Sequence, residues 1–324
     1  MEHTGLSRAM EQQLRTPLLS HRLIINIGKG GVGKSAVSAA MALAASRRNM
    51  RTLLVQIDAK DRISEYLGTA PVEGNLKEYL PNLYCVNIFP RDAQREYVLH
   101  RVKFAAIYKV VFENRLVRAF LNGVPAINDL MMLSKIGHHL SETRWGGGYT
   151  WDLIIVDAPP TGHGMFFLSV PDVIIQALSR GPLYQSALSM AQRLRDPSFT
   201  AFNLISLPEE MPVSETVDAY NTLIHKLGMT PSMLTVNRYT PGRFDGIEPE
   251  INRQATANAR DDGVMASALG ILDDELQRYT QATGHIERLT DTLHLPAVCI
   301  EDMISGRFGR EEIETMAHAL EARL

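Results

Sequence analysis

The feature that most constrains the fold is the stretch GKGGVGKS, at residues 28–35. It follows the apolar run LIINI (23–27) directly, and the helix-forming segment SAVSAAMALAAS begins at its last residue. Four glycines allow backbone N–H groups to turn toward one centre, and the N-terminus of the next helix attracts negative charge. A strand, Gly-x-x-x-x-Gly-Lys-Ser and a helix in this order predict a phosphate-binding loop.

The same pattern assigns roles within the loop. Lys34 is predicted to contact the phosphates, and the hydroxyl of Ser35 to ligate Mg²⁺. The predicted nucleotide-binding residues of the loop are Gly28, Gly30, Gly31, Val32, Gly33, Lys34, Ser35 and Ala36.

Further apolar runs alternate with helical stretches along the chain, at 52–57, 83–89, 151–156, 202–207, 233–237 and 297–300. Most are apolar at successive positions, which is typical of a parallel sheet covered by helices on both faces. The sequence therefore predicts an α/β fold with a doubly wound, mostly parallel sheet, of the P-loop NTPase type. We expect a single ATPase-like domain over residues 1–324, with a short N-terminal arm at 1–21.

Two stretches interrupt the alternation of strands and helices. Residues 94–141 and 171–199 have helical periodicity throughout, and together they predict a helical lobe over the site. Ordinary packing of helices on the sheet accounts for most of their apolar residues. Residues 241–262 are polar and predict a surface segment, whereas 309–324 predict a packed amphipathic helix with Ile313, Met316 and Leu320 on one face.

Composition excludes several classes of protein. The net charge of −3 disfavours a nucleic-acid partner, which usually binds a basic surface. Cys85 and Cys299 lie far apart in apolar runs, as buried thiols of a reduced compartment do. The N-terminus does not resemble a signal peptide, and no run of about 18 apolar residues occurs. We therefore expect a cytoplasmic protein that reaches a membrane, if it does, peripherally at the inner face.

Carboxylates follow two of the predicted strands, at the edge of the sheet where ligands collect. Asp157 ends the run WDLIIV and is suited to the Mg²⁺ site beside the loop. Asp58 ends the run TLLVQI and is suited to activating the attacking water. Asp61 is the weaker candidate for that role and fits a solvated loop charge better.

The second lysine of the loop, Lys29, is not needed for the loop's own phosphates. Across a two-fold dimer it could supply positive charge to the partner's nucleotide. KGGVGKS is similar to the deviant phosphate loop of P-loop ATPases that dimerise face to face around their nucleotides. Within that group, DAPPTGHGMFFLSVP (157–171) resembles the second switch of the arsenical-pump and tail-anchored-protein-targeting ATPases. LPEEMPVSET (207–216) and VNR (236–238) resemble later segments of the same family.

The resemblance extends from about residue 23 to residue 302 and implies a function. It implies an ATPase that binds ATP, ADP and Mg²⁺ and couples hydrolysis to transport or targeting of a membrane-related client. The partner would be a second copy or a related chain, with Lys29 acting in trans and Asp58 activating water. Adenine would meet Asn237, with Arg238 and Ile300 nearby.

The sequence also departs from that family. DAKDRIS lacks the proline that usually follows the switch I aspartate, and neither a CxxC pair nor the arsenite-binding cysteines are present. The histidines at 138, 139 and 163 have no further metal ligands at suitable spacing. Two alternatives remain at this stage: a nucleotide-gated regulatory or binding module with very slow hydrolysis, and a partition or positioning ATPase.

Overall fold

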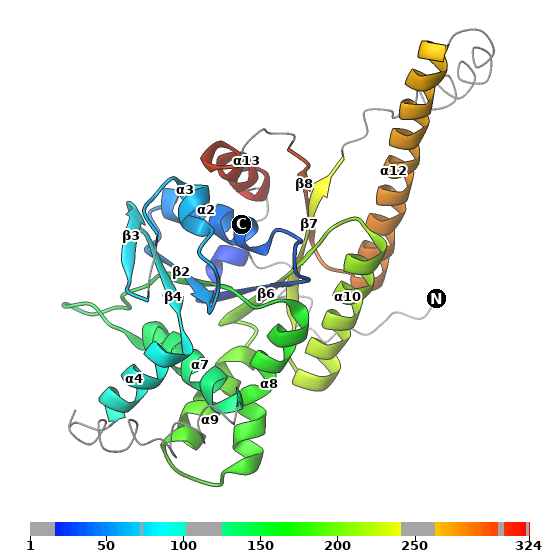
Figure 1. Ribbon diagram of the computed structural model, residues 1–324. Helices are drawn as coiled ribbons and strands as arrows, with labels where there is room; N and C mark the ends of the chain where they lie inside the picture. The colour runs from blue at the N-terminus through cyan, green and yellow to red at the C-terminus, as the bar shows by residue number, and fades with distance from the viewer. Residues whose placement is uncertain (1–16, 72–73, 102–124, 241–262, 304–307, 322–323) are drawn as a thin grey trace.

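The computed structural model describes residues 17–71, 74–101, 125–240, 263–303, 308–321 and 324. Its centre is an eight-stranded sheet with the strand order β3-β4-β2-β5-β1-β6-β7-β8 (Figure 1). The strands are β1 (Leu23–Gly28), β2 (Thr52–Ile57), β3 (Lys77–Leu80), β4 (Leu83–Ile88), β5 (Leu153–Asp157), β6 (Thr200–Ser206), β7 (Pro231–Tyr239) and β8 (Ala297–Glu301). All neighbouring pairs are parallel except β3 and β4.

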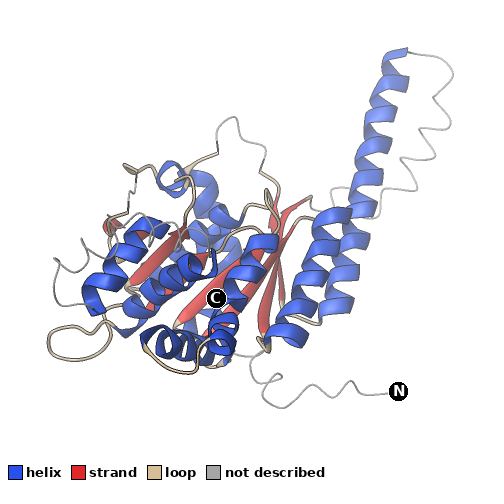
Figure 2. Ribbon diagram, turned by 60° about the horizontal axis from the view of Figure 1, so that its bottom comes forward, coloured by secondary structure: helices blue, strands red, loops and turns tan. Residues whose placement is uncertain are grey.

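Helices cover both faces of the sheet, so the predicted doubly wound α/β fold is confirmed (Figures 1 and 2). One face packs on α2 (Lys34–Arg47), α3 (Ile63–Leu67) and α13 (Arg310–Glu321). The other packs on α7 (Pro125–Ser141), α8 (Thr161–Ala177), α9 (Pro182–Arg195), α10 (Glu210–Asn221), η2 (Thr222–Leu227) and α12 (Gly263–Leu293). In β1, Ile25 and Ile27 face the second group of helices while Ile24 faces the first, which follows from the two-residue period of a strand.

Helices α2 and α13 pack on the same face of the sheet, and the burial of both agrees with their sequence patterns. Helix α2 is buried around almost its whole circumference, and its many alanines let it lie close to both the sheet and α13. Helix α13 buries Ile313, Met316 and Leu320, as its amphipathic pattern predicts. The N-terminal arm is described only from residue 17, where the turn η1 (Leu18–Ser20) buries two leucines.

The helical lobe differs from its predicted bounds. Helix α8 begins at Thr161, directly after the loop that follows β5, and continues through Pro171. The predicted second insertion at 171–199 therefore starts inside a helix. Proline disfavours helix interiors, but α8 is held on the sheet by a buried face that includes Phe167 and Ile174. Of the first insertion, the structure describes α4 (Pro90–Arg101) and α7.

Two further expectations need correction or lie outside the described residues. Strand β3 was not predicted, because this four-residue edge strand is largely exposed and has no continuous apolar run. Cys299 is only half-buried, unlike Cys85, because β8 is the opposite edge of the sheet. The surface segment predicted at 241–262 is not among the described residues. In the described parts of the chain, no helix combines the length and the hydrophobicity needed to cross a membrane.

Candidate functional site

Lys34 is folded back over its own loop. Its Nζ donates hydrogen bonds to the carbonyl oxygens of Gly28 and Lys29, each at 2.9 Å. The side chain is buried, and burial lowers the pKa of its ammonium group while the charge of Asp157 raises it. Because α2 starts at this residue, the ammonium group and the helix N-terminus act on the same point, where both favour an anion.

Two glycines of the loop are required by close contacts. A Cβ at Gly28 would lie 2.3 Å from the carbonyl oxygen of Ile205, and one at Gly33 would lie 2.2 Å from Nδ2 of Asn237. Gly33 also has a φ of 89°, in the left-handed region that glycine adopts at little cost. Between them, Val32 is buried, and its carbonyl accepts a hydrogen bond from Asn237 Nδ2 at 2.9 Å. The loop is therefore held rigidly in the shape that could surround a phosphate.

Ser35 and Asp157 meet beside the loop. The hydroxyl of Ser35 donates to Asp157 Oδ2 at 2.6 Å, and Ser38 donates to Oδ1 at 3.3 Å. Burial raises the pKa of Asp157, whereas the hydroxyl of Ser35, the charge of Lys34 and the hydroxyl of Ser38 lower it. Hydroxyl and carboxylate oxygens are suitable direct or water-mediated partners for Mg²⁺. The residues present therefore fit a bound magnesium ion.

A series of hydrogen-bonded, buried polar side chains extends from Asp157 through Ser38 into the sheet. Asn26 Nδ2 donates to Ser38 Oγ at 2.8 Å, and Asn203 Nδ2 donates to Asn26 Oδ1 at 2.9 Å. Thr235 then donates to Asn203 Oδ1 at 2.9 Å. These side chains link β1, β6 and β7 to α2 and are fully buried. These residues were not predicted from the sequence, although each of the apolar runs LIINI and FNLISL contains an asparagine.

Asp58 lies in a cavity of about 640 Å³ whose lining also includes Lys34, Ser35 and Asp157; we call it the phosphate-side cavity. Its side chain is exposed, and its φ of 43° directs the chain away from β2. Asn87 holds the following residue, donating from Nδ2 to the carbonyl of Ala59 at 2.6 Å. Asn87 of β4 thus anchors the switch I loop, which lacks the expected proline.

Asp61 has a structural role. Its Oδ1 accepts a hydrogen bond from the backbone N–H of Ser64 at 3.2 Å, at the beginning of α3. It does not belong to the lining of the phosphate-side cavity. The geometry therefore favours Asp58 over Asp61 as the carboxylate that could act on a bound ligand.

The structure adds Asp129 and His163 to the same cavity. Asp129 projects from α7 and is buried, with its Oδ1 3.6 Å from Nε2 of His163 on α8. Burial raises the pKa of Asp129, His163 lowers it, and the charge of Asp58 raises it again. Its Oδ2 is buried and makes no hydrogen bond to any described residue. The helical lobe thus places an unsatisfied carboxyl oxygen opposite the phosphate loop.

The histidines do not form a metal centre in the described part of the chain. His138 and His139 both contact Glu142, at 3.4 Å and 3.2 Å, and His163 contacts Asp129. No group of three or more potential metal ligands occurs among the described histidines, cysteines and carboxylates.

Lys29 points out of the phosphate-side cavity. Its Nζ lies 2.9 Å from Glu215 Oε1 on α10, and Thr161 donates to the other oxygen of that carboxylate at 3.0 Å. The hydrogen bond from Lys29 lowers the pKa of Glu215, against a small opposing effect of burial. The second lysine of the loop is therefore positioned by α8 and α10, and not by the loop's own cradle.

Asn237 and Arg238 line a separate cavity of about 420 Å³ on the other side of Gly33 and Ala36. Tyr66 and Asp302 are among the other residues that line this cavity. Ile300, which was predicted to contact the nucleotide, has its side chain buried in the core instead. Ile300 alternates with Glu301 along β8, so Glu301 lines the cavity while Ile300 faces inward.

Comparisons with known proteins agree with this geometry. Residues 21–184, from the beginning of β1 through α8, match the family model of the anion-transporting ATPases. The chain is 25% identical over 323 residues to the ATPase BagA of Mycobacterium tuberculosis and to the putative ATPase Mb3704 of Mycobacterium bovis, covering 88% of each chain. It is 23% identical over 273 residues to the ATPase GET3 of Candida glabrata, covering 73% of this chain and 78% of that protein.

Proposed function

The chain belongs to the family of anion-transporting ATPases and is itself an ATPase; from that premise we propose a more specific function. It is a Mg²⁺-dependent enzyme that closes as a nucleotide-sandwich homodimer and couples hydrolysis to a conformational change for a membrane-related client. One observation carries this proposal. The Ser35–Asp157 pair and the ammonium group of Lys34 converge on the cavity into which Asp58 also projects.

The phosphate loop supplies the binding energy. Backbone N–H groups of Gly30, Gly31 and Gly33 surround the phosphates, and Lys34 exchanges its two carbonyl acceptors for phosphate oxygens. Ser35 and Asp157 are the residues that would hold Mg²⁺. When bound, Mg²⁺ neutralises the charge that develops on the β- and γ-phosphate oxygens.

Asp58 has the role of orienting the attacking water. Its carboxylate accepts a proton from that water as the new bond to the γ-phosphorus forms, and the bond to the ADP oxygen breaks. Asp129 lies near Asp58 and His163, so the pKa of its carboxyl group responds to the charges of both. Loss of the γ-phosphate is then communicated to α7 and α8, which carry Asp129 and His163.

Lys29 has its role across the dimer. Its ion pair with Glu215 is partly exposed, and such pairs are worth only about 0–1 kcal/mol, so exchange for a partner's phosphate is inexpensive. In this proposal Glu215 and Thr161 hold the lysine while the subunits are apart. Closure releases it from α10 toward the nucleotide of the other subunit.

The client belongs at or in a membrane. The family's description as anion-transporting supports such a client. We place the protein in the cytoplasm, at the inner face of a membrane. The lobe formed by α4, α7, α8 and α9, hereafter the helical lobe, is the part that reports the nucleotide state to the client. These helices pack on one another and reach the phosphate-side cavity through α7 and α8.

Light scattering on the purified chain tests the dimer. Wild type should form a larger or tighter assembly with Mg²⁺ and a non-hydrolysable ATP analogue than with ADP. Lys29→Ala should bind the analogue with nearly unchanged affinity but fail to assemble, whereas the exposed-lysine control Lys60→Ala should behave like wild type. Assembly of Lys29→Ala equal to that of wild type would remove the trans role from this lysine.

A further inference from the structure

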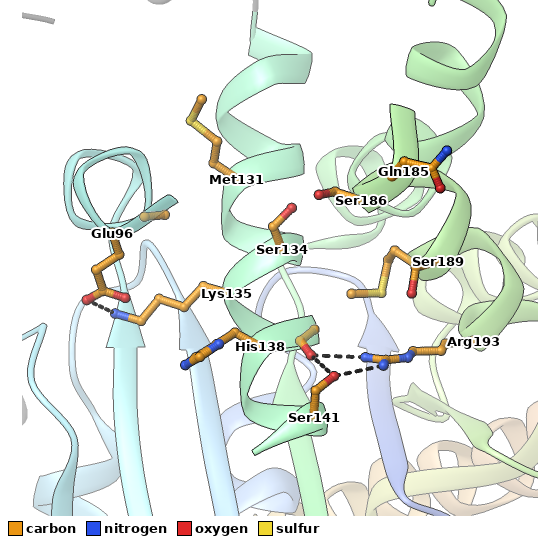
Figure 3. Close-up of a pocket in the computed structure, with 13 residues that line it drawn as sticks. Glu96, Met131, Ser134, Lys135, His138, Ser141, Gln185, Ser186, Ser189 and Arg193 are labelled. Carbon is orange, nitrogen blue, oxygen red and sulfur yellow. Dashed lines mark hydrogen bonds and ion pairs between the residues drawn. The ribbon is translucent and has the colours of Figure 1, made fainter. Parts of the chain in front are cut away.

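A second cavity, of about 300 Å³, lies within the helical lobe (Figure 3). It is enclosed by α4, α7 and α9, and we call it the lobe cavity. Its lining is Ala93, Glu96, Met131, Ser134, Lys135, Gly137, His138, Ser141, Gln185, Ser186, Ser189, Met190 and Arg193. None of these residues belongs to the lining of the phosphate-side cavity.

The walls of the lobe cavity are rich in hydrogen-bonding groups. Ser134 extends its hydroxyl from α7 toward α9 (Figure 3). That oxygen is buried and makes no hydrogen bond to any described residue. A buried hydroxyl without a partner is unfavourable by roughly 1–3 kcal/mol, so such groups in a cavity are usually met by water or a ligand.

The charges on the cavity wall leave one cation without a carboxylate. Lys135 turns away toward α4, where its Nζ pairs with Glu96 at 2.8 Å (Figure 3). His138 pairs with Glu142 at 3.4 Å. Arg193 reaches across from α9 (Figure 3), its guanidinium carbon 5.8 Å from the centroid of the Phe199 ring, and it forms no ion pair with a described carboxylate. The local balance of charge therefore favours an anion beside Arg193.

The guanidinium group of Arg193 is held in place while keeping donors to spare. Its Nη1 donates to the carbonyl of Gly137 at 3.0 Å, and its Nη2 donates to Ser141 Oγ at 2.8 Å. These bonds use two of the five N–H groups that a guanidinium offers. The guanidinium group of Arg193 is planar and keeps its remaining N–H donors in fixed positions. Such a group matches a carboxylate or a phosphate better than the ammonium group of a lysine does.

We propose that the lobe cavity is a binding site for a small hydroxylated organic anion, a carboxylate or a phosphate monoester. The acidic group binds Arg193, the hydroxyl groups of the ligand meet Ser134 and Ser189, and its carbon atoms lie against Met131 and Met190. A cavity of about 300 Å³ is of the size that takes a small metabolite.

Helix α7 joins this site to the ATPase site. Asn128, Asp129 and Met132 line the phosphate-side cavity, and Met131, Ser134 and Lys135 line the lobe cavity from another side of the same helix. If a ligand in the lobe cavity changes the affinity for nucleotide through α7, nucleotide changes the affinity for that ligand by the same factor.

The test measures direct binding by calorimetry, with malate, glycerol 3-phosphate and inorganic phosphate as separate probes. Because the phosphate loop also attracts anions, the titrations use full-length Lys34→Ala protein, so their outcome does not depend on nucleotide binding or turnover. We expect malate or glycerol 3-phosphate to bind, and which of the two binds distinguishes a carboxylate ligand from a phosphate monoester. Adding Arg193→Gln should weaken binding at least tenfold, and adding Ser134→Ala should weaken it several-fold.

Arg195→Gln is the matched control, because Arg195 lies on the same helix and pairs with Asp172 outside the cavity. It should leave ligand affinity unchanged, and thermal unfolding should confirm that each variant is folded. Ser134→Ala decides the matter if the Arg193 variant does not fold. The proposal is overturned if neither organic probe binds at millimolar concentration, if only inorganic phosphate binds, or if binding survives the Arg193 and Ser134 substitutions unchanged.

Discussion

The phosphate-side cavity and the lobe cavity share helix α7 but are built in opposite ways. Around the phosphate loop, contiguous residues supply the cradle, and the polar chain from Asp157 to Thr235 is hydrogen-bonded from one member to the next. In the lobe cavity, side chains from three separate helices meet, and the hydroxyl of Ser134 has no partner among the described residues.

The difference separates two kinds of site. A cradle made of backbone depends on glycine spacing and local geometry, so it leaves a motif in the sequence. A cavity between helices depends on which turns face one another, and Ser134, Gln185 and Arg193 form no motif. We therefore expect the phosphate-side cavity to be rigid and the lobe cavity to tolerate substitution.

Lys34→Ala should have the largest effect. Removing the ammonium group that lies over the loop should raise the Kd for ATP at least about 100-fold, or about 2.7 kcal/mol, and abolish turnover. Titration with a fluorescent nucleotide measures the affinity, with Lys60→Ala as the exposed control. Near-normal affinity in Lys34→Ala would mean that the loop's backbone alone holds the phosphates.

Asp58→Asn should lower the turnover number by about 10²- to 10⁴-fold while leaving nucleotide affinity within a few-fold, as expected for loss of a water-activating carboxylate. Steady-state phosphate release measures turnover. Asp61→Asn is the control, because its side chain caps α3 and an asparagine caps equally well. If Asp61→Asn loses more activity than Asp58→Asn, the water-activating role belongs to Asp61.

Asn203→Ala should lower the free energy of unfolding by about 2–4 kcal/mol, because it leaves the buried partners Asn26 and Thr235 unsatisfied. Urea denaturation measures the loss, and Asn221→Ala on the exposed end of α10 provides the comparison. A loss below about 0.5 kcal/mol, the range of ordinary surface substitutions, would show that the polar chain is not a fixed network.

Ser134→Ala should have the smallest effect, changing the free energy of unfolding by no more than about 0.5 kcal/mol without ligand, since water in the lobe cavity meets the hydroxyl and no hydrogen bond to a described residue is lost. Ser38→Ala gives the contrast within the polar chain and should cost about 1–3 kcal/mol. The same denaturation experiment serves for both. Equal losses in the two variants would contradict the distinction between the two cavities.

Much of the fold could be predicted because strands buried on both faces leave continuous apolar runs. Seven of the strands carry such runs, whereas β3 is short, exposed and at an edge, so its pattern is weak. The bounds of the helical lobe were misplaced because α8 passes through Pro171, a residue whose packing on the sheet outweighs its local preference. Ile300 was assigned to the nucleotide although alternation along β8 directs its side chain into the core.

The residues of the candidate site also fall into those that could be predicted from the sequence and those that only the structure brings together. Lys34, Ser35, Asp58 and Asp157 follow from motif and strand ends, and the structure brings all four to one cavity. Asp129 and His163 could not be paired from the sequence, because 34 positions separate them and only the packing of α7 against α8 places them 3.6 Å apart.

The sequence by itself therefore determined the phosphate loop, the parallel sheet and the family, since each depends on backbone preferences and apolar periods within short segments. Tertiary structure alone decided that Lys29 pairs with Glu215, that Asn87 anchors the Asp58 loop, and that Arg193 lines the lobe cavity without an ion pair to a described carboxylate. Those contacts join residues far apart along the chain, and their geometry depends on how whole helices pack against one another and the sheet.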